Sequence, residues 1–129
     1  MKIRLFTVTL ASLLLTGTAS TLAIAQTAAD PIESYCATLS EDDHHASDGY
    51  ELRDAAAIIR QDRANYHQFG VRDPGDENDS TFSSKANRAR LEQMLKRGSM
   101  DRSVRNAIVN GTPDVCIDVY RNYINVTLM

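Results

Sequence analysis

The sequence predicts an α+β fold, mostly helical, in which three or four short helices pack on a C-terminal β-hairpin and one disulfide braces the structure. Three observations lead to this prediction. Apolar residues recur at helical spacing through the middle of the chain. They alternate with polar residues near its end, and Cys36 and Cys116 are the only two cysteines.

Residues 1–25 have the pattern of a cleavable export signal. Two basic residues precede an apolar stretch at 5–15, and Ala23 and Ala25 supply small residues two positions apart. The alternative is a membrane anchor, but a spanning helix needs roughly twenty apolar residues and this run has eleven. We therefore expect residues 26–129 to form a single small domain in the periplasm or outside the cell, with no membrane insertion after cleavage.

The charge balance of this domain argues against nucleic acid as a partner. Residues 26–129 hold twelve of the fourteen Lys and Arg residues and all seventeen Asp and Glu residues, which gives a net charge of −5. The arginines are dispersed among acids, whereas phosphate backbones are bound by clustered basic side chains.

An oxidising compartment favours a disulfide between Cys36 and Cys116, with two free thiols as the alternative. The bridge would span eighty residues and stabilise the fold by roughly 4 kcal/mol, because it limits the freedom of the unfolded chain.

The first two helices are predicted from caps and apolar spacing. Asp30 and Pro31 suit a helix start, and the apolar positions that follow recur at i, i+3, i+4 and i+7, which puts Cys36 on the buried face of a short helix. A second helix should begin at 48–51 and end at Gly70. Arg63 falls on its apolar face, so this side chain either extends its head to solvent or pairs with a carboxylate.

Two further helices should follow a polar loop at 73–80. The third begins near Ser83 or Ser84 and ends at Gly98, with apolar positions at Ala86, Leu91, Met94 and Leu95. The fourth runs from Asp101 to Asn110, and its Val104 and Ile108 point inward.

The last fifteen residues change to the alternation of β-strands. A turn at Arg121-Asn122 would place the apolar residues of both strands on one face, because it pairs Val119 with Ile124, Ile117 with Val126 and Val115 with Leu128. Cys116 then faces away from this apolar stripe. A single bent strand is the alternative, since Arg-Asn is not a favoured turn pair.

The polar loop at 41–45 is the candidate metal site, through His44 and His45. Imidazoles and carboxylates are good ligands for zinc, copper or nickel. Successive side chains of an extended loop point apart, however, so the alternative is a solvated loop with no metal. The acidic loop at 73–80 does not fit the EF-hand frame, and a different calcium loop remains open there.

No recognised catalytic motif is present: the chain lacks a Gly-x-Ser-x-Gly elbow, a His-Glu-x-x-His pair and a Gly-rich phosphate loop. The leading hypothesis is therefore a non-enzymatic exported protein without a cofactor that binds another protein, such as an inhibitor, immunity or accessory factor. Its partner would be basic, because the loops are acidic. Tyr120 and Tyr123, which flank the predicted turn, either belong to that interface or cover a helix. The alternatives are a metal-binding module and a small periplasmic hydrolase with a site between the helices and the hairpin.

Overall fold

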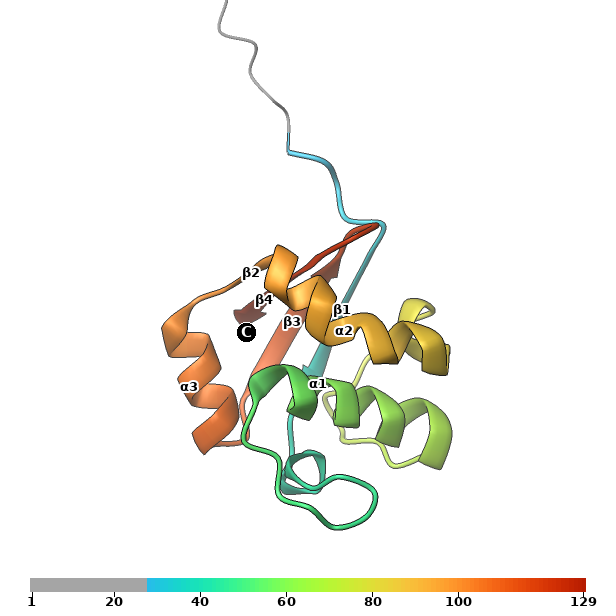
Figure 1. Ribbon diagram of the computed structural model, residues 1–129, viewed down its shortest axis with the longest axis vertical. Coiled ribbons are helices and arrows are strands. Elements are labelled where there is room, and N and C mark those ends of the chain that lie inside the picture. Colours follow the sequence, from blue (N-terminus) through green and yellow to red (C-terminus); the bar gives the residue numbers. More distant parts are fainter. Residues whose placement is uncertain (1–27) are drawn as a thin grey trace, which may run out of the picture.

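The computed structural model describes residues 28–129, and the expected export signal, 1–25, lies outside the described residues. The fold is α+β, with three α-helices against a four-stranded mixed sheet (Figure 1). The strands are β1 (Glu33–Thr38), β2 (Ser99–Met100), β3 (Asp114–Val119) and β4 (Ile124–Leu128). The α-helices are α1 (Ala55–Ala64), α2 (Lys85–Arg97) and α3 (Arg102–Asn110). Three shorter helical segments are η1 (Glu41–His44) before α1, η2 (Asn65–Phe69) directly after α1, and η3 (Thr81–Ser83) before α2.

The predicted hairpin forms the centre of this sheet. The strand order is β1-β3-β4-β2, with β1 and β4 antiparallel to β3 and β2 parallel to β4. Within the hairpin Val119 lies opposite Ile124, Ile117 opposite Val126 and Val115 opposite Leu128, so the predicted register is confirmed. The two outer strands, the six-residue β1 and the two-residue β2, were not predicted, and they add neighbours on both sides of a hairpin that would be marginal alone.

The prediction of a helix at the first cysteine was wrong, because residues 33–38 form strand β1. Tyr35, Ala37 and Leu39 are buried and alternate with more exposed residues, which is the periodicity of a strand. Ile32, which completed the helical pattern, is 68% exposed. Eight residues are too few to separate the two periods when pairing with another strand decides the outcome.

The disulfide between Cys36 and Cys116 is present, but it joins two neighbouring strands rather than a helix and a strand. The two cysteines lie directly opposite each other in β1 and β3, with their Cα atoms 4.0 Å apart. Because β1 comes from the start of the described chain and β3 from near its end, the bridge fixes the register between the two ends of the fold.

The helices in the middle of the chain are confirmed, with shifted starts. α1 begins after Asp54, whose carboxylate accepts a hydrogen bond from the Ala57 N–H at 3.1 Å, and not at 48–51. It continues through η2 to Gly70, which ends it with a left-handed φ of 70° as predicted. α2 follows the cap Ser84, but Ala86 is exposed and Arg88 takes the inward position instead.

The buried apolar core lies between the helices and one face of the sheet. α1 and α2 cross this face and α3 packs beside them (Figure 1). The sheet contributes alternate residues to this core: Tyr35, Ala37, Val115, Ile117, Val119, Ile124 and Val126. The intervening residues point to the opposite face, where they are half-buried or exposed. Among residues 28–129, no helix has the length and apolar character to cross a membrane.

Candidate functional site

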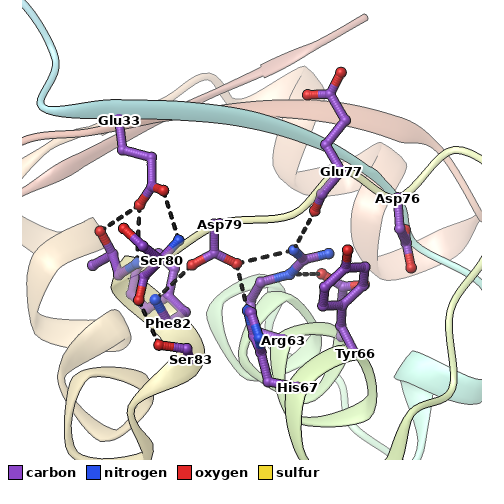
Figure 2. A network of polar contacts seen from close by, with 12 residues as sticks. Glu33, Arg63, Tyr66, His67, Asp76, Glu77, Asp79, Ser80, Phe82 and Ser83 are labelled. Carbon is purple, nitrogen blue, oxygen red and sulfur yellow. Dashed lines mark hydrogen bonds and ion pairs between the residues drawn. The ribbon is translucent and has the colours of Figure 1, made fainter.

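A buried polar network around Arg63 is the densest cluster of titratable groups (Figure 2). The Arg63 side chain is fully buried and bonds to the Asp62 carboxylate at 2.7 Å, to Asp79 at 3.1 Å and to the Glu77 carbonyl at 2.9 Å. The rings of Tyr35 and Tyr66 stack on its guanidinium, 4.5 and 4.7 Å from its central carbon. Of the two environments predicted for Arg63, the structure shows the pair with carboxylates.

The same network includes His67, whose Nε2 lies 2.7 Å from Asp79. Burial raises the pKa of Asp62 to about 7 against the opposing pull of Arg63. Perturbed pKa values mark functional sites when a substrate can reach them. Asp62 and Asp79 are each 1% exposed, so this cluster has the chemistry of a structural anchor between α1 and the loop at 73–80.

The two histidines of the predicted metal loop face different partners. Both ring nitrogens of His44 lie against backbone carbonyls, Ser40 at 2.9 Å and Ile108 at 2.8 Å, so this ring joins η1 to α3. His45 is exposed, with its Nδ1 at 3.2 Å from the Glu41 carbonyl. Within 28–129, no group of three or more His, Cys, Asp or Glu side chains is arranged to hold a metal ion. The metal-binding alternative stays a prediction.

The outer edge of β1 is covered by the acidic loop at 73–80. Glu77 pairs with Cys36 through both its backbone N–H, at 2.9 Å, and its carboxylate, at 2.7 Å. Asp76 accepts a hydrogen bond from the Thr38 N–H at 3.1 Å. An exposed strand edge can pair with a strand of another chain. These carboxylates prevent such pairing because they occupy the backbone N–H groups of Cys36 and Thr38. Sequence reasoning missed this role and considered the loop for calcium.

The sheet face turned away from the helices carries mostly polar side chains. We call it the open face and define it by the outward residues of β1, β3 and β4 and of the turn: Ser34, Cys36, Thr38, Asp114, Cys116, Asp118, Tyr120, Tyr123, Asn125 and Thr127. Its carboxylates are held in place, since Ser34 donates a hydrogen bond to Asp118 at 2.7 Å and Thr38 donates one to Asp114 at 2.6 Å.

The two predicted interface tyrosines are brought together on this face. The rings of Tyr120 and Tyr123 are stacked, with centroids 4.3 Å apart and planes inclined by 10°. The Tyr120 pKa is raised by desolvation and by the charge of Asp118. The half-exposed disulfide lies on the same face, between β1 and β3. Stacked aromatic rings beside the fixed Asp118 carboxylate form a rigid surface with little side-chain entropy left to lose.

The strands and the helices differ in the charged residues that they contain. Strands β1, β3 and β4 contain three acidic residues and no Lys or Arg. Helices α1, α2 and α3 contain nine Lys and Arg residues and two acids. Two of the strand acids, Asp114 and Asp118, lie on the open face, whereas Glu33 faces the helix layer and accepts hydrogen bonds from the Ser80 and Thr81 N–H groups at 2.6 and 2.9 Å.

Comparison with known proteins finds no match to this chain among protein families, curated proteins or solved structures.

Proposed function

We propose that this chain is a non-enzymatic exported protein that binds another, basic protein through its open face. The observation that carries the proposal is a stacked tyrosine pair beside the oriented carboxylate of Asp118, on strands that contain no Lys or Arg and that hold a second oriented carboxylate, Asp114, at the far end of β3. An exposed cation, Arg121 of the turn, lies next to the pair. Tyrosine is enriched among the residues that dominate protein interfaces, and opposite charge speeds and orients association.

Two further features support a binding role. Asp114 and Asp118 lie on β3, which is paired with β1 and joined to it by the disulfide. Binding would therefore cost little conformational entropy. A disulfide also fits an oxidising compartment such as the periplasm. The titratable cluster that would suit a hydrolase is enclosed around Arg63, which favours binding over catalysis.

The partner follows from the charge of the face. A protein that presents Lys or Arg side chains would meet Asp114 and Asp118, while its apolar or planar groups would cover Tyr120 and Tyr123. Because such attraction is screened by salt, association should slow as ionic strength rises.

The test begins with residues 26–129, oxidised, as bait in an extract of the source organism, read by mass spectrometry. A stoichiometric basic partner is then purified and its binding kinetics are measured against variants. We expect Tyr123→Ala to weaken binding by about 2 kcal/mol, the loss typical of a central aromatic contact. Asp114→Asn with Asp118→Asn should slow association about tenfold at low salt.

The matched control is Tyr50→Ala. Tyr50 is 77% exposed and lies in the loop before α1, outside the open face, so this substitution should leave the affinity unchanged. The absence of any stoichiometric partner, or an equal loss in the Tyr50 and Tyr123 variants, would contradict the proposal.

A further inference from the structure

A cavity on the helix layer is lined by three basic side chains and no acidic one. It lies between α1 and α2, has a volume of about 190 Å³, and is bounded by Arg60, Gln61, Ala64, Gln68, Lys85, Arg88 and Ala89. Arg60 and Lys85 are exposed at its rim. Since α1 and α2 cover the sheet from the side opposite the open face, this cavity does not belong to the surface described above.

Arg88 is the unusual member of this group. It is 6% exposed, and its guanidinium bonds only to neutral oxygens: the Phe82 and Ser83 carbonyls at 2.8 and 3.0 Å and the Gln68 side chain at 3.3 Å. Burial of a charge is costly unless an opposite charge compensates for it. Arg63, the other buried arginine of the described chain, has two carboxylates around it.

Counter-charge is missing for the whole group. Within residues 28–129, no carboxylate lies within 4 Å of the basic nitrogens of Arg60, Lys85 or Arg88. The acid on α2, Glu92, is bonded to Lys96 at 2.9 Å, and its pKa is lowered first by that hydrogen bond and least by Arg60. Three basic side chains from two helices therefore line one small cavity, and none of them is paired with a carboxylate of the described residues.

We infer that this cavity is a binding site for a phosphate group, either the free ion or a small phosphomonoester. Arginine and lysine together offer many N–H donors around one point, which suits a tetrahedral oxyanion with several acceptor oxygens better than a planar carboxylate. The volume admits a phosphate with few additional atoms. The amide of Gln68 and the methyl groups of Ala64 and Ala89 would contact the remainder of the ligand.

The experiment is a titration of residues 26–129, oxidised and at low ionic strength, followed by amide NMR and by calorimetry. The probes are inorganic phosphate, glycerol phosphate and acetate. We expect saturable binding of a phosphate probe, with shifted amides on α1 and at the start of α2, and much weaker binding of acetate. Tighter binding of inorganic phosphate would identify the free ion, and tighter binding of glycerol phosphate would identify a monoester as the natural ligand class.

Variants separate a site from general attraction to a basic surface. Lys85→Gln should weaken phosphate binding about tenfold, since it removes one charge-assisted contact, and Arg60→Gln should act similarly. Both residues are exposed, so both variants should fold as the wild type does. The control, Arg97→Gln, removes an exposed charge at the far end of the same helix and should leave the affinity within twofold. No saturable binding of either phosphate probe, equal binding of acetate, or an equal loss in the Arg97 variant would overturn the proposal.

Discussion

Arg63 shows how one residue connects three parts of this fold. Its guanidinium lies between the rings of Tyr35 on β1 and Tyr66 on η2, and it bonds to Asp79 and to the Glu77 carbonyl in the loop that covers β1. Removing either member of a buried pair leaves an uncompensated charge, which costs more than the pair contributes. The network therefore fixes one arrangement of helix, strand and loop, and its effect on stability depends on protonation.

Asp62 should make the folded protein more stable in mild acid than at neutral pH. Burial raises its pKa from the ordinary 3.8 to about 7, so the folded state holds a proton that the unfolded chain releases. This contribution to the free energy of unfolding is full below pH 3.8 and is lost as the pH rises to about 7. Burial also raises the Asp43 pKa, which acts in the same direction, whereas hydrogen bonds from Ser80 and Thr81 lower the Glu33 pKa and act in the opposite one.

Thermal unfolding from pH 5 to pH 8 tests this expectation. Wild-type Tm should fall as the pH rises, and Asp62→Asn, which cannot ionise, should flatten most of that slope. Asp48→Asn is the control, because Asp48 is exposed and outside the network. A Tm slope that is the same in the Asp62 variant and the wild type would show that Asp62 is ionised throughout this range.

At the scale of elements, sequence periodicity predicted α2 and the C-terminal hairpin but not β1, although β1 is as long as β3. The thirteen residues of α2 and both strands of the hairpin were recognised. β1 was not, although the sequence held a signal: in the predicted hairpin Cys116 faces away from the apolar stripe, so a bridged Cys36 must do the same. That places Tyr35 and Ala37 inward, as in a strand.

Other features of the fold could not be predicted from the spacing of apolar residues in the sequence. β2 has two residues and exists because β4 lies beside it. Arg88 occupies an inward position of α2 because the Phe82 and Ser83 carbonyls and Gln68 accept its hydrogen bonds. Of the candidate site residues, Tyr120 and Tyr123 were named from the sequence, but Asp114 and Asp118 could be assigned to the same face only after the strands were paired.

Gly98 is required where α2 turns into β2. A Cβ atom at this position would lie 1.7 Å from the Ile124 carbonyl oxygen of β4, so the backbone of α2 and β4 would have to separate. We expect Gly98→Ala to lower the free energy of unfolding by about 3 kcal/mol, the upper part of the usual range for overpacking. Urea denaturation measures this loss. Ser99→Ala, at the exposed next residue, should change stability by less than about 0.5 kcal/mol, and similar values for the two variants would contradict the close approach.

At the scale of the whole molecule, the two proposed sites lie on opposite layers of the fold and carry opposite charge. The open face presents Asp114 and Asp118, and the cavity between α1 and α2 is lined by Arg60, Lys85 and Arg88, so the two sites do not compete for the same surface. Such a division also directs the molecule during an encounter, because a basic partner is attracted to one side and repelled from the other. The side chains of the open face keep their places only while β1 and β3 keep their register. The disulfide between Cys36 and Cys116 fixes that register.

The disulfide closes a chain segment that contains α1, α2 and α3, since Cys36 and Cys116 are separated by 80 residues. Cys36→Ala with Cys116→Ala should therefore reduce the free energy of unfolding by about 4 kcal/mol, mainly because the unfolded chain gains freedom. The same freedom should raise the urea m-value, as the unlinked chain exposes more surface when it unfolds. Urea denaturation of the variant beside the oxidised wild type, and of the wild type with reductant, tests both effects. The reduced wild type and the variant should coincide, and a variant with the midpoint and m-value of the oxidised protein would show that the bridge does not constrain the unfolded chain.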